Sequence, residues 1–589
     1  MPERRRPDPL DLSHYFSRAT KSREESHIKD FYKYFTIPGI AQLAGGLPNA
    51  SMFPYDTLEA SVALPHRFTP TPNDPNETQR IGGPEGGSDE QASSRLVVPK
   101  ASSTQDLLKK IDVTSALQYG TAQGYPPLFT FLRQFTRDNL HPNVPYAGGP
   151  EIVLSCGNTD GFSKTLEALS NEWSEEKDWI REREGLLVEE FCYMNAIQAA
   201  KPRGLQIVPV ALDGEGMIAE GKRGLRDVLA NWDFRNGKRP HLMYTVTVGQ
   251  NPTGGTLSVQ RRKELYQVCH EFDVIIIEDD PYWYLQYPSA LDSEKVRGEG
   301  AKGASLEPLK GHRSSGFSFL DSLVPSYLSV DTDGRVVRLD TFSKTIAPGC
   351  RLGWVTAQPK IIERILRITE TSTQQPSGFV QSMVAELIIG PTKSDDDGRG
   401  GGPKGNGWNA AGWVRWLSGL RGAYERRMHS MCDILDEGRF HIHTKTSQIG
   451  DRASRRDSVG SQWDMVDKVK MYDFIWPRGG MFVWVELLLE NHPLASRIPV
   501  EKLSRSLWQY LTTKPYLVLV SPGDLFASTP EVKTEKGPRF FRLCFAAVPA
   551  EELESISNRF VACLNDFWTK TELKDPDDEV PAFSGSPAF

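Results

Sequence analysis

The chain has 589 residues, of which 39% are hydrophobic and 25% charged, and its formal net charge is −7 at pH 7. This length allows two or more domains, and the composition is that of an ordinary soluble globular protein. The acidic balance argues against nucleic acid or a membrane surface as a partner, and no apolar run is long enough to predict a transmembrane helix. The scattered cysteines include no Cys-x-x-Cys pair, which argues against a disulfide framework or a zinc site and favours the reducing cytoplasm.

The N-terminal segment 1–45 is predicted to be an arm with short helical pieces, and its arginine-rich start lacks the apolar stretch of a secretory signal. A large domain is expected over 46–390, a smaller α+β domain over 409–575, and a tail over 576–589. Four segments rich in Pro, Gly, Ser and Asp are expected to be disordered surface insertions, because such tracts bury too little apolar area to offset the entropy of ordering. These insertions are 67–105, 288–318, 391–408 and 445–462.

Strand-like apolar runs alternate with helical periodicity in the predicted large domain. Strands are expected at 152–155, 186–189, 206–211, 242–246, 274–278, 336–339 and 352–355, and helices at 161–172, 258–271 and 360–371. This alternation predicts an α/β fold with a mostly parallel sheet buried on both faces. In the smaller domain, helices are expected at 413–437 and 550–569, and strands at 481–486, 516–520 and 540–545.

Polar residues follow several of the predicted strands, at the sheet edge where α/β proteins bind their ligands. The most distinctive is Lys344, on a small-residue turn between two strands, with Arg351 seven positions later. A lysine amine has a pKa of about 10.4 and is a poor nucleophile at neutral pH unless it is desolvated or held as a Schiff base. An isolated Ser-Lys pair is most often a surface feature, so the surrounding motifs decide its interpretation.

Taken together, the motifs resemble those of fold type I, class I and II aminotransferases, which depend on pyridoxal 5'-phosphate (PLP). The motifs are Gly157-Asn158-Thr159-Asp160-Gly161, Gln250-Asn251-Pro252-Thr253-Gly254, Glu278-Asp279-Asp280-Pro281-Tyr282, Ser343-Lys344, Arg351 and Arg542. Residues 44–49 (Ala-Gly-Gly-Leu-Pro-Asn) and 116–120 (Ala-Leu-Gln-Tyr-Gly) are similar to those of fungal aromatic amino-acid and 2-aminoadipate aminotransferases and of kynurenine aminotransferases. The resemblance covers residues 11–570 apart from the insertions.

The resemblance implies a role for each residue around the cofactor ring. Lys344 would carry PLP as a Schiff base and move the substrate α-proton as general base and acid. Asp279, in preference to Asp280, would keep the ring nitrogen protonated; the alternative is a turn cap. Asn251 and Tyr282 would hydrogen-bond the phenolic oxygen of the cofactor.

The resemblance also places the cofactor phosphate at the start of a helix. The backbone N–H groups of Asn158 and Thr159 would bind the anion, together with the side chains of Thr341 and Arg351. Tyr119 would reach the phosphate of a neighbouring subunit, which implies a homodimer with shared active sites. The alternative for Tyr119 is a core tyrosine within one subunit.

Three further residues complete the predicted site. Arg542, a charge within an apolar strand, would bind the substrate α-carboxylate, with a structural ion pair as the alternative. Gly46 and Asn251 would contact the same substrate. Tyr193 would stack on the cofactor ring and take part in catalysis, or else pack in the core. The aromatic-rich arm 15–35, with Arg18, Arg23 and Lys29 as candidate donors, is expected to line the pocket for the substrate side chain.

The implied activity is PLP-dependent transamination of aromatic L-amino acids, with kynurenine and 2-aminoadipate as further candidates, 2-oxoglutarate as acceptor and ping-pong kinetics. The implied partners are therefore small amino acids and 2-oxo acids. A PLP lyase or decarboxylase, or an aminotransferase of a specialised pathway, remains an alternative, because a fold alone does not fix the reaction. A transcription regulator would need an N-terminal helix-turn-helix and a basic face, which the sequence lacks.

Overall fold

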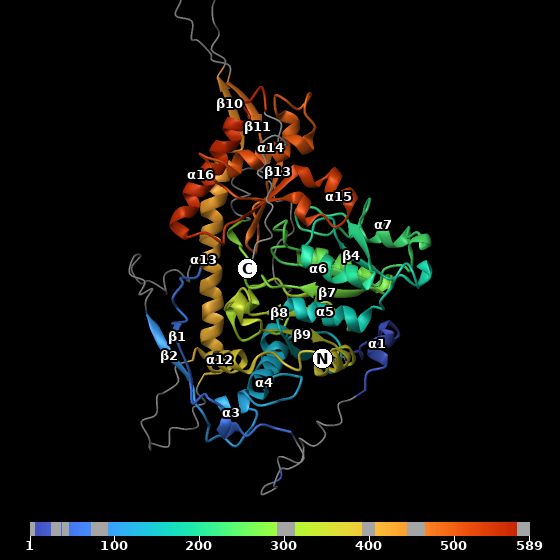
Figure 1. The fold of residues 1–589 in the computed structure, drawn as a ribbon, viewed down its shortest axis with the longest axis vertical. Helices are drawn as coiled ribbons and strands as arrows, with labels where there is room; N and C mark the ends of the chain where they lie inside the picture. The colour runs from blue at the N-terminus through green and yellow to red at the C-terminus, as the bar shows by residue number, and fades with distance from the viewer. Residues whose placement is uncertain are drawn as a thin grey trace, which may run out of the picture. The chain divides into compact units, whose positions relative to one another are not determined.

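The computed structural model describes residues 6–24, 37, 46–71, 92–290, 312–390, 407–444 and 466–573. The chain divides into two compact units (Figure 1). The first contains residues 1–425 and 478–480, and the second contains 426–477 and 481–589. The boundary falls within the long helix α13 (Asn409–Glu437).

A seven-stranded sheet with the order β3-β9-β8-β7-β6-β4-β5 forms the centre of the first unit. Its strands are β3 (Glu151–Ser155), β4 (Gly185–Glu189), β5 (Gln206–Val210), β6 (Leu242–Thr245), β7 (Ile275–Asp279), β8 (Val336–Thr341) and β9 (Gly353–Ala357). The five adjacent strands β8, β7, β6, β4 and β5 run parallel to one another. Strand β9 is antiparallel to both of its neighbours, β3 and β8. All residues of β4, β6, β7, β8 and β9 are buried, as in a sheet covered on both faces. The predicted mostly parallel α/β sheet is confirmed.

Helices cover both faces of this sheet. On one face, α5 (Asn158–Leu169) and α11 (Pro359–Glu370) pack on each other and on β3 and β9. On the other, α7 (Leu225–Ala230) and α8 (Val259–Glu271) share an apolar core with β4 to β8. Further helices in the described residues of this unit are α1 (Arg18–Lys21), α3 (Val113–Ala116), α4 (Pro126–Phe135), α6 (Met194–Ala200), α10 (Ser318–Asp321) and α12 (Gly378–Ile389).

The predicted disordered insertion 67–105 is wrong in part. Residues Ser93–Val98 form β2, which pairs antiparallel with β1 (Leu58–Ala63) and buries Leu96, Val97 and Val98. The polar composition of the whole window concealed this short apolar run. Residues 72–91 and most of the other three predicted insertions, at 291–311, 391–406 and 445–465, lie outside the described residues.

The second unit contains a four-stranded antiparallel sheet with the order β12-β13-β15-β14. Its elements are β12 (Tyr472–Asp473), β13 (Phe482–Leu487), β14 (Ser521–Pro522), β15 (Phe540–Cys544), the hairpin strands β10 (Phe440–Thr444) and β11 (Val466–Lys470), and the helices α14 (Val500–Thr512), α15 (Pro530–Glu535) and α16 (Ala550–Phe567). The strand predicted at 516–520 is wrong, since Leu517 has a φ of 51°, which interrupts an extended backbone. Leu517 and Leu519 are also exposed.

Candidate functional site

Asp279 is the last residue of β7, and its carboxylate is buried at the carboxyl edge of the sheet. One oxygen accepts a hydrogen bond from Asn158 Nδ2 at 2.6 Å, and the other accepts one from the Tyr244 hydroxyl at 2.8 Å. Burial raises the pKa of Asp279 to about 6, although both hydrogen bonds lower it. Among the described residues, no cation forms an ion pair with this carboxylate. A buried carboxylate of this kind suits a cationic partner such as a protonated ring nitrogen.

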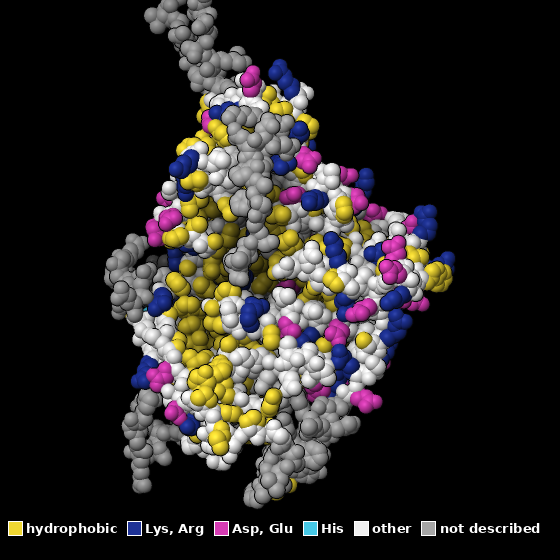
Figure 2. Space-filling model, in the orientation of Figure 1, with side chains coloured by type: hydrophobic (Ala, Val, Ile, Leu, Met, Phe, Trp, Pro, Cys, Tyr) yellow, Lys and Arg dark blue, Asp and Glu magenta, His cyan; other side chains and the backbone are white. Residues whose placement is uncertain are grey.

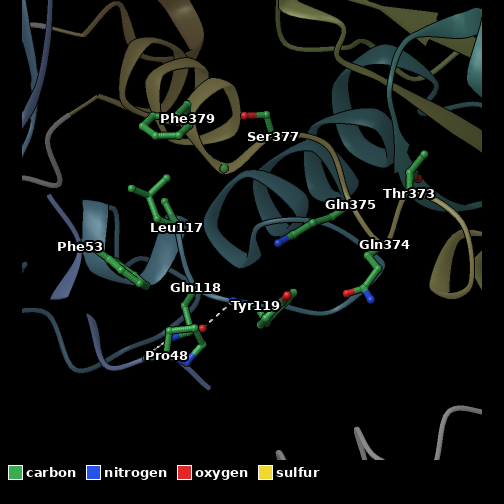
Figure 3. Close-up of a pocket in the computed structure, with 12 residues that line it drawn as sticks. Pro48, Phe53, Leu117, Gln118, Tyr119, Thr373, Gln374, Gln375, Ser377 and Phe379 are labelled. Carbon is green, nitrogen blue, oxygen red and sulfur yellow. Dashed lines mark hydrogen bonds between the residues drawn. The ribbon is translucent and has the colours of Figure 1, made fainter. Parts of the chain in front are cut away.

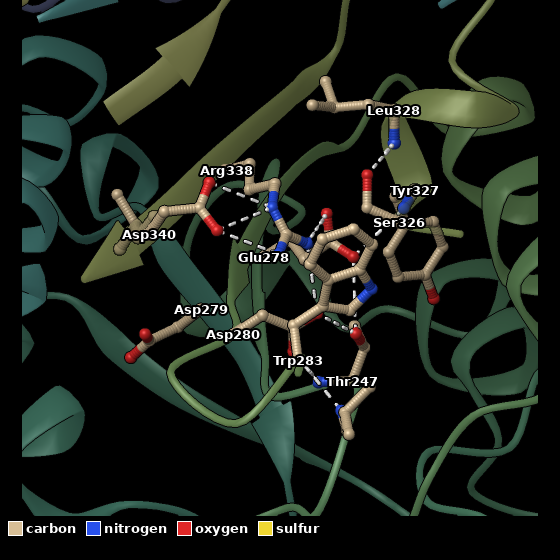
Figure 4. Close-up of polar contacts among 12 residues, drawn as sticks. Thr247, Glu278, Asp279, Asp280, Trp283, Ser326, Tyr327, Leu328, Arg338 and Asp340 are labelled. Carbon is tan, nitrogen blue, oxygen red and sulfur yellow. Dashed lines mark hydrogen bonds and ion pairs between the residues drawn. The ribbon is translucent and has the colours of Figure 1, made fainter. Parts of the chain in front are cut away.

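Asp280, one residue later, belongs to the opposite face of the sheet. Figure 4 shows the Asp279 carboxylate pointing away from the guanidinium of Arg338. Arg338 is within 3.1 Å of both Asp280 and Glu278, and it pairs with Asp340 at 2.9 Å. Successive side chains of an extended backbone point to opposite faces, so adjacent carboxylates reach different surroundings. This arrangement supports Asp279 as the partner of a bound ring and leaves Asp280 in a buried ion cluster.

Lys344 lies on the turn after β8 and is half-buried. Its amine is 6.0 Å from the ring centroid of Tyr282, which is buried on the turn after β7. Asn251 is buried beyond the carboxyl end of β6. Its neighbour Gln250 braces that turn, because its side chain donates to the carbonyl of Phe191 at 2.7 Å and accepts from the backbone N–H of Thr253 at 2.8 Å.

Gly157 and Arg351 meet at the start of α5. Gly157 has a φ of 88°, and a Cβ there would lie 2.4 Å from the Arg351 guanidinium. Arg351 donates to the carbonyl of Cys156 at 3.4 Å and to Ser343 Oγ at 3.4 Å. A guanidinium beside the free N–H groups of a helix start is suited to bind a phosphate.

The hydroxyl beside Arg351 is that of Ser343, which the sequence interpretation did not assign. The predicted ligand Thr341 donates its hydroxyl proton to the Leu352 carbonyl at 3.1 Å and accepts from the Ser343 backbone N–H at 3.1 Å. Thr341 therefore supports the turn that carries Ser343. Thr159 is exposed in the first turn of α5.

Tyr119 lies on the surface, with 60% of its area exposed, and lines a cavity of about 480 Å³ (Figure 3). Gln118 holds this stretch, since it donates to the Pro48 carbonyl at 2.7 Å and accepts from the Tyr119 N–H at 2.9 Å. An exposed tyrosine is not the core residue of the alternative interpretation. Gly46 is also exposed, and a Cβ there would meet no atom within 4 Å.

Tyr193 precedes α6, is half-buried, and accepts a hydrogen bond from Asn195 at 2.8 Å.

Arg542 belongs to the second unit, on β15. Its guanidinium lies between the rings of Phe482 and Phe526, at 4.4 and 4.5 Å from their centroids. Stacking on two aromatic faces fixes the plane of the guanidinium, as binding a carboxylate through both nitrogens requires.

The prediction that the arm lines the substrate pocket is wrong for its described part. Tyr15 stacks on His241 at 4.4 Å and donates to the Asp273 carbonyl at 2.8 Å. His241 and Asp273 precede β6 and β7, so this contact lies at the amino edge of the sheet, opposite the predicted site. Arg23 pairs with Glu167 near the end of α5. Residues 25–36 lie outside the described residues.

Sequence interpretation missed two side-chain contacts of Asp279, those of Tyr244 and Asn158. One signal was present, because a tyrosine inside a fully buried strand needs a partner for its hydroxyl.

No group of His, Cys, Asp or Glu side chains suited to a metal ion occurs in the described ranges. None of the helices in the part of the chain that is described combines the length and apolarity needed to cross a bilayer.

These residues fit PLP as a group. A buried carboxylate that lacks a cation suits the pyridine nitrogen, and the helix start with Arg351 suits the phosphate. Lys344, close to Tyr282, lies on the turn that also carries Ser343.

Comparison with known proteins gives a consistent result. A family model described as aminotransferase class I and II matches residues 109–446. The chain is 30% identical over 570 residues to an aromatic amino acid aminotransferase of Schizosaccharomyces pombe, which covers 94% of this chain and 98% of the relative. It is 32% identical over 490 residues to an L-tyrosine:2-oxoglutarate aminotransferase of Tapinella panuoides, with 83% and 76% covered. The crystal structure of aminotransferase Aro8 from Candida albicans matches with a TM-score of 0.71 at 29% identity, covering 96% of this chain and 100% of that chain.

Proposed function

Because the chain belongs to the class I and II aminotransferases and is a PLP-dependent transaminase, we propose that it transfers the amino group of aromatic L-amino acids to 2-oxoglutarate. The similarity over nearly the full length to an aromatic amino acid aminotransferase carries this proposal. The relative named for L-tyrosine and 2-oxoglutarate supports the same pair of substrates. Kynurenine and 2-aminoadipate are further candidate donors.

When bound, PLP serves as an electron sink for the charge that develops at the substrate α-carbon. Asp279 would pair with the ring nitrogen and hold its proton, and Asn251 and Tyr282 would bind the phenolic oxygen. Lys344 Nζ would hold the cofactor. Once the substrate amine has displaced it, the free Nζ would accept the α-proton as general base and return it as general acid. With the 2-oxo acid the same residues act in the reverse order, which gives ping-pong kinetics.

The other contacts orient cofactor and substrate. Arg351, Ser343 and the backbone N–H groups of Asn158 and Thr159 would hold the phosphate, and Thr341 fixes the turn that carries Ser343. Tyr193 would lie against the ring face.

Arg542 binds the α-carboxylate that all these substrates share, and Gly46 and Asn251 contact the same substrate. Because Arg542 acts on the shared carboxylate, the choice of side chain must come from other residues.

We also infer a homodimer with shared active sites, located in the cytoplasm. Figure 2 shows apolar side chains gathered on the face of the first unit that carries α12. Phe379 of α12 packs edge-on against Tyr55 at 5.0 Å, and both are exposed, as is Tyr119. A second copy of the chain covering this face would remove these side chains from water and bring Tyr119 to the phosphate of its partner.

A panel of amino donors, each with 2-oxoglutarate, tests the substrate proposal. Phenylalanine, tyrosine and tryptophan should show higher kcat/KM than alanine, with the 2-oxo acid and glutamate formed in equal amounts. If alanine is the best donor, the aromatic assignment is wrong. Sustained turnover without any 2-oxo acid would instead point to a lyase or decarboxylase.

A further inference from the structure

Tyr244, on β6, is a buried residue whose hydroxyl meets the carboxylate of Asp279. Its side chain is 1% exposed, and its hydroxyl donates to Asp279 Oδ2 at 2.8 Å. Its ring packs edge-on against Phe162 of α5, with 4.9 Å between the centroids. Within the described residues, the bond to Asp279 is the single hydrogen bond of this hydroxyl. None of the motifs that identify the family includes Tyr244.

Two neutral donors from different elements hold the two oxygens of Asp279. Asn158 donates to Oδ1 at 2.6 Å and also to the Leu339 carbonyl at 3.1 Å, so its amide is fixed by the backbone of β8. Tyr244 donates to Oδ2 from β6. With one donor on each oxygen, the carboxylate cannot rotate freely, and its plane is set before a ligand arrives.

The charges around Asp279 make these donors important. Burial is the main cause that raises the pKa of Asp279, and the nearby carboxylates Asp280 and Asp340 raise it further. Glu189, on β4, and Cys192, after β4, also act on Tyr244 electrostatically. Burial raises the pKa of Glu189 to about 7 and that of the Cys192 thiol well above its ordinary value, so the thiol carries no charge near neutral pH. The hydrogen bonds from Tyr244 and Asn158 lower the pKa of Asp279, so they favour its ionised form against burial and against neighbouring negative charge.

We propose that Tyr244 is a positioning residue that orients the Asp279 carboxylate and keeps it ionised, so that the ring nitrogen of PLP meets an anion. The proposal rests on the proposed function, in which Asp279 pairs with that nitrogen. A protonated Asp279 would lose its attraction for the pyridinium. The Tyr244 hydroxyl keeps its proton at neutral pH and remains a hydrogen-bond donor, because burial raises the pKa of Tyr244 well above its ordinary value.

The test measures the affinity of the cofactor-free enzyme for PLP from about pH 5 to about pH 9. In the wild type, affinity should fall as the pH drops through the pKa of Asp279, about 6. Tyr244→Phe removes one hydrogen bond to a charged group and keeps the ring, so the midpoint should move up by about one pH unit. This shift corresponds to an affinity loss of about twofold at pH 7, which approaches tenfold below about pH 6 and disappears at high pH.

Tyr146→Phe is the matched control, because the Tyr146 hydroxyl is fully buried without a hydrogen-bond partner in the described structure. Its midpoint should equal that of the wild type. Thermal unfolding without cofactor shows whether each variant is folded. If Tyr244→Phe is not recovered folded, Asn158→Ala removes the other donor and should also move the midpoint upward.

The outcomes separate the two levels of the proposal. Weaker binding of Tyr244→Phe by the same factor at every pH, with an unchanged midpoint, would overturn the role of Tyr244 and leave a packing role. Asp279→Asn should remove the contribution of this carboxyl to the pH dependence and leave that of the phosphate and of the Lys344 amine. If Asp279→Asn keeps the wild-type profile, the pairing of Asp279 with the ring nitrogen is itself wrong.

Discussion

At the residue scale, the two neighbouring carboxylates Asp279 and Asp280 serve different purposes. Asp279 meets Tyr244 and Asn158 on the α5 face, whereas Asp280 meets Arg338 on the α8 face. The alternation of side chains along an extended backbone separates them, although they are adjacent in the chain. Activity should therefore depend on the first carboxylate and stability on the second.

Asp279→Asn should lower kcat by about 10³-fold while the protein stays folded, because the ring nitrogen loses its anionic partner. Asp280→Asn should lower the free energy of unfolding by about 2 kcal/mol, because it leaves Arg338 with one carboxylate fewer. Kinetics and denaturant unfolding of both variants test this division. Equal loss of kcat in the two variants would contradict the assignment.

Lys344→Ala should abolish transamination and remove the covalent attachment of the cofactor. Borohydride reduction of the wild type followed by peptide mapping should place the cofactor on Lys344. Lys360→Ala provides the control, because Lys360 is a surface residue paired with Asp11 at 3.3 Å. A reduced adduct on any lysine other than Lys344 would show that the site has been placed wrongly.

At the element scale, the start of α5 depends on a glycine. Gly157→Ala should weaken PLP binding, because the φ of 88° is strained for alanine and the new Cβ would displace the Arg351 guanidinium, 2.4 Å away. Gly148→Ala has a comparable φ of 74° and open space around its Cβ, so it should cost only stability, about 1 kcal/mol. PLP affinity and thermal unfolding distinguish the two effects. If both variants bind PLP with equal affinity, Arg351 is not part of the phosphate site.

The hairpin of β10 and β11 should tolerate a shorter connection. The strands pair with Thr444 opposite Val466, so a short loop can join them. Deleting residues 447–461 should leave kcat/KM and the melting temperature nearly unchanged, since loop-closure entropy depends weakly on length. A variant that does not fold would show that the segment is structured.

At the scale of the whole molecule, the proposed homodimer can be tested by mixing inactive variants. Tyr119→Ala and Lys344→Ala should each be impaired as pure proteins, because one lacks the phosphate contact offered to its partner and the other lacks the lysine. In a mixed dimer, one site combines the wild-type Lys344 with the wild-type Tyr119 of the other subunit. Mixing under exchange conditions should therefore restore activity. If no activity returns although mixed dimers form, Tyr119 acts within its own subunit.

Much of the fold follows from the sequence by itself. The strands predicted at 242–246, 274–278 and 336–339 correspond to β6, β7 and β8 with small differences at their ends, since continuous apolar runs of this length are typical of strands buried on both faces. The family was also predicted from the sequence, because its motifs are contiguous and appear in a fixed order. The prediction of disorder was wrong for residues 93–98, which form β2, because this short apolar run lies in a segment of polar composition.

The tertiary structure decided the contacts between side chains. Tyr244, Asp279 and Asn158 come from β6, β7 and α5, and they meet because β6 and β7 are neighbours in the sheet and α5 covers the face that carries both. Likewise, the turn after β8 places Ser343 beside Arg351 and directs the Thr341 hydroxyl to the backbone. Periodicity records which residues are buried, but hydrogen-bond partners depend on strand order and helix packing, which bring together residues far apart in the chain.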